Sequence, residues 1–214
     1  KTRSLLNKKK SLISFIGSPW TLAVYMFGLK TGKNLIDTVK LKKLEPQIKI
    51  ALANINKYLC THILNQVEAG ADVVQVFDSW AGLIPEEKLL DYCYEPNKKI
   101  VEFCKKINIP VICFPKGIKK NYVNFGANVN PDCLSLDYEI NPVWANDNLK
   151  KFCLQGGMDP KILFKEEGEI FKEVDKYLSV FKDRPYVFNL GHGLLPETNP
   201  NVLQRVIERV KSFK

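Results

Sequence analysis

Short apolar runs alternate with longer helical patterns along these 214 residues, and this alternation limits the fold more than any other feature. Six runs have the length of strands and are followed by turn residues: 12–16, 73–77, 111–114, 133–136, 152–155 and 186–190. Stretches of helical period separate and follow them: 21–27, 45–69, 86–106, 119–125, 142–148, 160–181 and 200–213. The runs are continuously apolar, which is typical of parallel strands buried on both faces. The sequence therefore predicts an α/β protein with a parallel sheet.

The close spacing of the central strands favours a (β/α)8 TIM barrel over an open sheet. An open doubly wound sheet usually carries a phosphate-binding loop after its first strand, and neither GxGxxG nor GxxxxGK[ST] occurs here. Six strands are two fewer than a complete barrel needs, and the chain begins with Lys1 rather than Met. We therefore expect a single barrel domain over residues 1–214, N-terminally incomplete because its first two βα units precede Lys1.

Composition is that of an ordinary globular protein, with 45% hydrophobic and 26% charged residues. The net charge of +9 is compatible with nucleic acid, an acidic membrane surface or a polyanionic small molecule as a partner. Nucleic acid is disfavoured because the lysines are dispersed and no recognition motif occurs. Pro19 and small polar residues interrupt the apolar segment 11–29, so we expect neither a signal peptide nor a membrane span.

The six cysteines include no CxxC pair and mostly fall inside apolar runs. This usage is typical of reduced, buried thiols in a cytoplasmic protein, so we expect no disulfide bonds. Neither histidine has a second metal-ligating residue at the spacing of a local ligand pair. We therefore expect no bound metal.

Functional groups of a (β/α)8 barrel lie at the carboxyl ends of its strands, and each of the six ends here is polar, glycine-rich or both. His192, held between two glycines after the last strand, is the best candidate, because imidazole exchanges protons near neutral pH. Tyr25 and Ser79 follow the first and second strands, where their hydroxyl groups could bind a substrate. Packing for Tyr25 and a helix cap for Ser79 are the alternatives.

Other polar residues have weaker claims to a function. His62 lies within a helical stretch and is expected to be a partly exposed structural residue. Asp78 and Asp137 could act as acid–base groups. Asp159 precedes Pro160, a pattern that favours a helix cap.

Four strand-end segments, GSPWTLAVYM, QVFDSWAG, LQGGMDP and FNLGHGLLPETNP, resemble those of the uroporphyrinogen decarboxylase family. The resemblance implies decarboxylation of the four acetate side chains of uroporphyrinogen III to coproporphyrinogen III in haem and porphyrin biosynthesis. It further implies a cytoplasmic homodimer without a metal or organic cofactor. Tyr25, Ser79 and His192 correspond by motif position to substrate-binding residues. The family's catalytic aspartate and its arginines lie in a segment that would precede Lys1, so we expect residues 1–214 alone to lack decarboxylase activity.

Two alternatives remain open. Related barrels transfer methyl groups to or from cobalamin-type cofactors and hold zinc through a His-x-Cys pair, where this chain has Cys113-Phe114-Pro115-Lys116. The chain could also be a noncatalytic barrel fragment that binds a tetrapyrrole or a partner chain. One departure from the decarboxylase pattern is Gly157, which stands where the family commonly has Asn.

Overall fold

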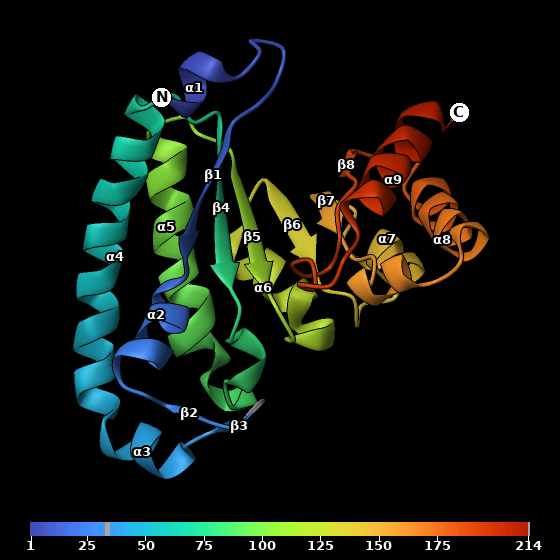
Figure 1. Ribbon diagram of the computed structural model, residues 1–214. Helices are drawn as coiled ribbons and strands as arrows, with labels where there is room; N and C mark the ends of the chain where they lie inside the picture. Colours follow the sequence, from blue (N-terminus) through green and yellow to red (C-terminus); the bar gives the residue numbers. More distant parts are fainter. Residues whose placement is uncertain (33–34, 214) are drawn as a thin grey trace. The chain divides into compact units, whose positions relative to one another are not determined.

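The computed structural model describes residues 1–32 and 35–213, which form two compact units, Lys1–Asp132 and Cys133–Lys214 (Figure 1). All six predicted strands are present, three in each unit, and the strands within each unit pair in parallel. Helices alternate with these strands along the chain. The α/β prediction is therefore confirmed, and the order of elements is that of a partial (β/α)8 barrel.

The first unit contains strands β1 (Ile13–Gly17), β4 (Val73–Asp78) and β5 (Val111–Pro115), in the order β1-β4-β5. In Figure 1, the long helices α4 (Glu45–Glu68) and α5 (Glu95–Lys106) lie along one side of these strands. Alternate strand residues such as Ile16, Val74 and Val76 are buried, as expected of the side covered by helices.

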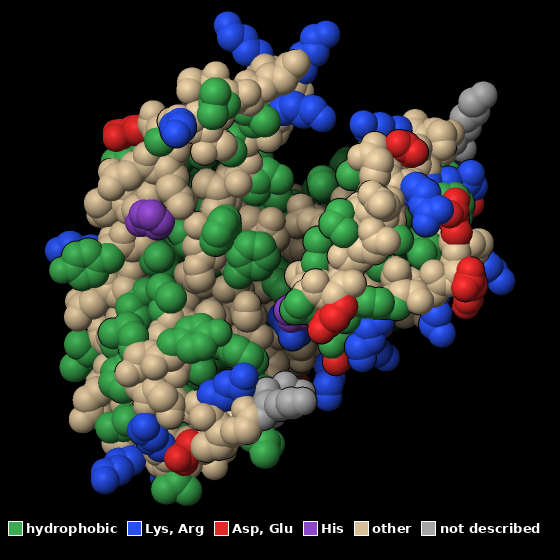
Figure 2. Space-filling model, viewed as in Figure 1, with side chains coloured by type: hydrophobic (Ala, Val, Ile, Leu, Met, Phe, Trp, Pro, Cys, Tyr) green, Lys and Arg blue, Asp and Glu red, His purple; other side chains and the backbone are tan. Residues whose placement is uncertain are grey.

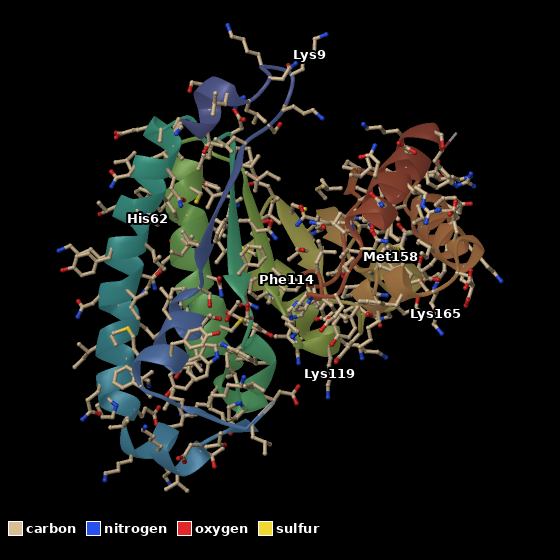
Figure 3. The ribbon with its side chains drawn as sticks, viewed as in Figure 1. Lys9, His62, Phe114, Lys119, Met158 and Lys165 are labelled. Atoms are coloured by element: carbon tan, nitrogen blue, oxygen red, sulfur yellow. The ribbon has the colours of Figure 1, made fainter. Side chains whose placement is uncertain are left out.

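The opposite side of the same strands carries an aromatic row. Phe77 packs edge-to-face between Phe15 and Phe114, at ring-centroid distances of 5.9 Å on either side. Phe15 is 65% exposed, whereas Phe114, labelled in Figure 3, is buried. In a barrel, side chains on this side of the strands point toward the interior.

Local sequence explains most of the remaining boundaries in the first unit. Ser18 caps α2 (Pro19–Met26) by accepting a hydrogen bond from the Thr21 amide, and Pro19 occupies the first helical position, where its missing N–H costs nothing. Asp37 caps α3 (Thr38–Lys43) in the same way. Helix α6 (Tyr122–Val129) follows β5.

Several elements differ from the sequence prediction. The predicted helix 86–106 consists of a 3-10 turn at Glu86–Lys88, a π turn at Leu90–Tyr94 and then α5. The physical reason is Pro96, which cannot donate the bond that an α-helix requires toward Tyr92. The sequence did not predict α3, the 3-10 turn at Ala81–Leu83 or the hairpin of β2 (Lys30–Thr31) with β3 (Leu35–Ile36), and the short helix α1 (Thr2–Leu5) precedes the first predicted strand.

The second unit contains strands β6 (Cys133–Leu136), β7 (Cys153–Gly156) and β8 (Tyr186–Val187), in the order β6-β7-β8. The predicted strand 186–190 is continuous only at its first two residues, but a bridge between Met158 and Leu190 extends the pairing. Three helices complete the unit: α7 (Pro142–Asn148), α8 (Glu167–Val180) and α9 (Pro200–Ser212).

The predicted helix 160–181 is divided into a 3-10 turn at Pro160–Phe164 and helix α8. The carboxylate of Asp159 accepts a hydrogen bond from the Lys161 amide at 2.9 Å, which confirms its predicted role as a cap. None of the described helices is long and apolar enough to cross a membrane. None of the six cysteines, all of which lie among the described residues, forms a disulfide bond; Cys60 and Cys153 are half-buried and the other four are buried.

Candidate functional site

Tyr25 and Ser79 lie in one neighbourhood of the first unit, and Trp80 connects them. Tyr25 is in the last turn of α2 and is 63% exposed. Its ring meets the Trp80 ring edge-to-face at a centroid distance of 6.1 Å. Ser79 directly precedes Trp80 at the carboxyl end of β4. Its hydroxyl makes no hydrogen bond with the described residues, and the following 3-10 turn begins without a side-chain cap. The cap proposed as an alternative role for Ser79 is therefore wrong.

Trp80 and Lys30 are additions that the sequence alone did not single out. The Lys30 ammonium lies 3.9 Å from the centroid of the Trp80 ring, a cation–π contact. Trp20 donates its indole N–H to the Trp80 carbonyl at 3.0 Å, which fixes the backbone at this point. The Trp80 indole N–H is buried and has no partner among the described residues. A cation and an unpaired N–H donor beside Tyr25 suit an anionic ligand.

Asp78 is buried, and its carboxylate is hydrogen-bonded to neighbouring side chains rather than exposed to a ligand. It is 1% exposed. Its carboxylate accepts hydrogen bonds from the Thr21 hydroxyl and the Asn97 amide, both at 3.0 Å, and from the Cys93 thiol at 3.5 Å. Burial raises its pKa, while hydrogen bonds from Ser18, Asn97 and Thr21 oppose that shift. Asp78 thus joins β4 to α2 and α5 and holds the strand end that carries Ser79.

His192 lies where the carboxyl-terminal segments of three strands meet within the second unit. The Gly191 amide donates to the Met158 carbonyl, after β7, at 2.7 Å. A Cβ on Gly191 would collide with the backbone nitrogen of Tyr138, after β6, so only glycine permits this approach. The His192 ring is exposed and lies 6.4 Å, between centroids, from the Tyr138 ring.

The tautomer of His192 follows from its own loop. The Gly193 amide donates to His192 Nδ1 at 2.6 Å, so Nδ1 carries a lone pair and the proton of neutral imidazole is on Nε2. Asp137, another acid–base possibility, is 1% exposed and accepts a hydrogen bond from the Glu139 amide. The Nε2–H of His192 is therefore the better donor to a carboxylate at this place.

The double glycine after β7 is fixed from two sides. Tyr186 donates to the Gly156 carbonyl at 2.8 Å and Tyr177 to the Gly157 carbonyl at 2.7 Å. Gly157 has a φ of +103°, and a Cβ there would stand 2.8 Å from Tyr177 Cε1. The position where the family commonly has Asn is thus closed to a side chain by its backbone and by Tyr177.

His62 is an exposed residue of α4 with the Gln66 amide 3.1 Å from its Nε2, which confirms the structural interpretation (Figure 3). Within residues 1–32 and 35–213, no group of three or more His, Cys, Asp or Glu side chains could hold a metal ion. Lys and Arg side chains are spread over the face seen in Figure 2 rather than gathered in one patch.

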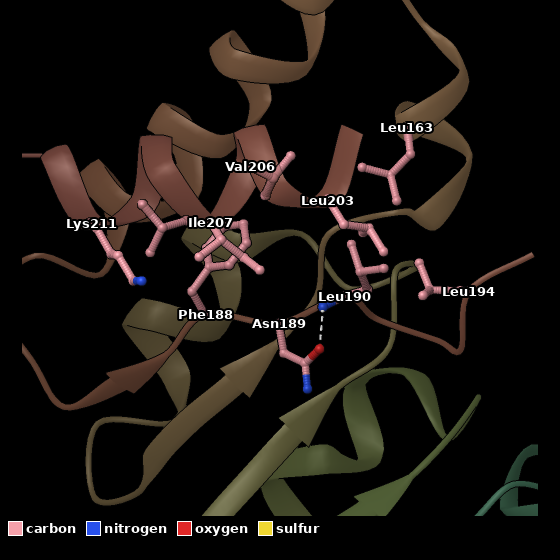
Figure 4. Close-up of a pocket in the computed structure, with 10 residues that line it drawn as sticks. Leu163, Phe188, Asn189, Leu190, Leu194, Leu203, Val206, Ile207 and Lys211 are labelled. Carbon is pink, nitrogen blue, oxygen red and sulfur yellow. Dashed lines mark hydrogen bonds between the residues drawn. The ribbon is translucent and has the colours of Figure 1, made fainter. Parts of the chain in front are cut away.

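A hollow of about 380 Å³ in the second unit has a different character (Figure 4). It lies along α9 and is lined mainly by apolar side chains, including Leu163, Phe188, Leu190 and Val206. Among the described residues that line it, Lys211 is the only one with a charged side chain. Such a lining offers no acid–base pair, so we place no chemistry there.

Of the three candidates from the sequence, Tyr25 and Ser79 belong to the first unit and His192 to the second. Each follows the carboxyl end of a different strand. The structure brings Tyr25 and Ser79 together through Trp80, and the joint role of all three stays a prediction. Trp80 could have been found in the sequence from its place in the second strand-end segment, whereas Lys30 and Tyr177 carried no such signal.

Parallel strands, covering helices and polar strand ends define the class of this protein as a (β/α)8-barrel type. Its fold matches that of a methyltransferase from Methanosarcina mazei with a TM-score of 0.81 over 98% of this chain and 60% of that chain. Sequence identity is 16%, so the match shows the fold alone.

The family model described as uroporphyrinogen decarboxylase (URO-D) matches residues 1–213, and the chain belongs to this family. Uroporphyrinogen decarboxylase from Cereibacter sphaeroides is 33% identical over 211 residues, covering 96% of this chain and 62% of the relative. The enzyme from Orientia tsutsugamushi is 37% identical over 220 residues, covering 99% of this chain and 63% of the relative. The enzyme from Wolbachia pipientis is 35% identical over 216 residues, covering 100% of this chain and 63% of the relative. The chain therefore spans less than two thirds of the length of these relatives.

Proposed function

We propose that the protein containing these residues decarboxylates the four acetate side chains of uroporphyrinogen III to give coproporphyrinogen III. The observation that carries the proposal is the family match over residues 1–213. It is supported by the placement of the resembling segments, each of which spans the carboxyl end of a strand or the loop that follows. Ligands of such barrels bind at that end.

Tyr25, Ser79 and His192 are proposed to bind substrate carboxylates. A phenol O–H, a serine hydroxyl and the Nε2–H of imidazole are all donors suited to carboxylate oxygens. Lys30 and the Trp80 indole N–H add a cation and a further donor beside Tyr25. The net charge of +9 favours the approach of a polyanion.

The reaction needs little from the protein beyond binding, orientation and stabilisation of charge. Protonation of a pyrrole carbon makes a cationic ring, and that ring accepts the electron pair released when carbon dioxide leaves. The side chains proposed above would hold the substrate in the orientation that the reaction needs. Such positioning lowers the activation barrier of decarboxylation. The aspartate that stabilises the cation belongs to the family's N-terminal segment, so residues 1–214 are assigned binding roles only.

The proposal also covers the domain content, the oligomeric state and the location of the protein. We infer one barrel domain over residues 1–214, completed by two further βα units that precede Lys1, and a homodimer in the cytoplasm. Closing of the barrel would cover the exposed aromatic face of β1, where Phe15 is 65% exposed. It would also remove an unpaired strand edge, which otherwise favours aggregation.

Product analysis of three proteins tests the function. Residues 1–214 alone should not turn over, because an electrostatic contribution of roughly 3 kcal/mol or more to transition-state stabilisation is absent. The protein encoded by the whole reading frame should convert uroporphyrinogen to coproporphyrinogen. Its His192→Ala variant should be slower or accumulate partly decarboxylated products, since one carboxylate contact is lost.

The possible failures have distinct meanings. Turnover by residues 1–214 alone would show that the catalytic group lies within them. An inactive whole protein would favour the noncatalytic alternative. Stoichiometric zinc in purified protein would instead favour a methyltransferase.

A further inference from the structure

Two cysteines of the second unit face each other across a strand pair. Cys133 is the first residue of β6 and Cys153 the first residue of β7, and the two are register partners. Adjacent strands lie about 4.8 Å apart, and a disulfide bridges Cα atoms separated by roughly 4.4–6.8 Å. The two side chains point to the same side of the sheet, and Cys133 hydrogen-bonds Cys153. The backbone thus already has a spacing that a disulfide can join.

A guanidinium group accompanies the two thiols. Arg184 is held by backbone carbonyls, donating to Asn146 at 3.2 Å, to Leu149 at 2.7 Å and to Phe152 at 2.5 Å. Its Nε is buried without a hydrogen-bond partner in the described part of the chain, where no carboxylate pairs with Arg184 either. Burial lowers the pKa of Arg184, and the charges of Cys153 and Cys133 oppose that shift. The site therefore has a fixed cation next to sulfur atoms that can become anionic.

The pKa of Cys153 is shifted in the opposite direction from the pKa values of Cys60, Cys93, Cys104 and Cys113. The pKa of Cys153 is lowered to about 7 by the hydrogen bond from Cys133 and by the Arg184 charge, against the effect of burial. Burial raises the pKa values of Cys93, Cys104 and Cys113. Cys60 is half-buried like Cys153, yet burial raises its pKa too. Lys106 opposes that shift at Cys60, but burial has the larger effect. Cys60 is therefore a control of similar accessibility that lacks the Arg184 guanidinium.

We propose that Cys153 is a modification site for hydroperoxides and that Cys133 resolves the oxidised product to an intrachain disulfide. The Cys153 thiolate sulfur attacks the peroxide oxygen: an S–O bond forms, the O–O bond breaks, and the departing oxygen takes a proton to leave as an alcohol or water. Cys133 sulfur then attacks Cys153 sulfur: the S–S bond forms, the S–O bond breaks, and the leaving hydroxide takes the Cys133 proton as water. Two thiols lose two electrons in all, and one peroxide gains them.

Within the second unit, the pair lies at the opposite end of the strands from His192. Cys133 and Cys153 begin their strands, whereas Tyr138 and Met158 lie beyond the opposite, carboxyl ends. The modification site is therefore independent of the proposed decarboxylase activity, and its test does not require turnover.

Hydrogen peroxide added to the folded protein encoded by the whole reading frame, followed by nonreducing peptide mapping, tests the proposal. We expect a linked Cys133–Cys153 peptide to form at least tenfold faster than any oxidation of Cys60. Cys133→Ser should leave a sulfenic acid on Cys153, which dimedone traps, and Cys153→Ser should leave Cys133 unoxidised. Cys60→Ser should leave the linkage unchanged.

Peptide mapping of the unsubstituted protein is sufficient to test the proposal. The test therefore does not depend on whether each variant folds. Oxidation of Cys60 at the rate of Cys153 would overturn it. Accumulation of sulfenic acid on Cys153 while Cys133 is present would overturn the resolving role.

Discussion

The phenol of Tyr177 donates to the carbonyl of Gly157 at 2.7 Å, and the same ring occupies the space into which a Cβ at position 157 would project. Helix α8 thereby fixes the path of the chain after β7. The next residue, Met158, bridges Leu190 and accepts from the Gly191 amide. Gly191 directly precedes His192, so a buried helix residue controls where the candidate imidazole lies.

Replacing Gly157 should destabilise the fold. Gly157→Ala and Gly157→Asn both place a Cβ at a φ of +103° and 2.8 Å from Tyr177 Cε1. We expect a loss of about 1–3 kcal/mol in the free energy of unfolding, with Ala at least as costly as Asn because Asn tolerates positive φ better. Urea titration of each variant and of the unsubstituted protein measures this change in the free energy of unfolding.

Gly168→Ala is the matched control for this substitution. Gly168 lies within α8, and a Cβ added there would meet no atom within 4 Å beyond its own helix backbone and chain neighbours. Alanine there should be neutral or stabilising by up to about 1 kcal/mol. Equal effects at the two positions would contradict the role assigned to Tyr177.

How far the sequence predicts this structure depends on how local the signal is. The strand 133–136 and the helix 142–148 were predicted with the bounds observed, because an apolar run and an Asn141-Pro142 cap are local features. The hairpin of β2 and β3 was missed because strands of two residues show no periodicity. The π turn before α5 depends on how Pro96 packs, which the pattern of apolar residues does not reveal.

The candidate site divides in the same way. Tyr25, Ser79 and His192 could be chosen because they follow strands, a rule of the fold class. The contact of Lys30 with Trp80 joins residues 50 positions apart, and that of Tyr177 with Gly157 joins a helix to a loop. Such contacts arise only from tertiary packing, so no spacing in the sequence indicates them.

Asp78 should make stability depend on pH. Burial raises its pKa in the folded state, so between the unfolded pKa of about 4 and the folded pKa the folded protein binds more protons. The contribution of this group to stability therefore falls as pH rises through that window. Asp78→Asn removes the titration, so the stability of the unsubstituted protein minus that of the variant should decrease from pH 4 to pH 7. Urea unfolding across this range checks it, and a difference that increased with pH would contradict the assignment.

Alkylation should distinguish Cys153 by its pH dependence. Iodoacetamide reacts with the thiolate, so the rate at Cys153 should reach half its maximum near pH 7, the value set by Cys133 and Arg184. The half-buried Cys60, whose pKa is raised, should still gain rate above pH 9. Peptide mapping after short exposures gives both rates in one sample. Parallel profiles for the two thiols would show that Arg184 does not stabilise the thiolate.

Lys30 should contribute to substrate binding through charge, and this prediction rests on the proposed decarboxylase function. In the protein encoded by the whole reading frame, Lys30→Gln removes the cation that lies 3.9 Å from the Trp80 ring centroid, beside Tyr25. We expect KM for uroporphyrinogen to rise about two- to fivefold with little change in kcat, since an exposed charge contributes about 0.5–1 kcal/mol. The difference should shrink in high salt, because mobile ions screen the attraction to a polyanion. Lys57→Gln, the same change of charge on an exposed residue of α4, controls for net charge and should leave KM nearly unchanged. An equal rise in KM for both variants would mean that the overall field of the protein, rather than the Trp80 neighbourhood, attracts the substrate.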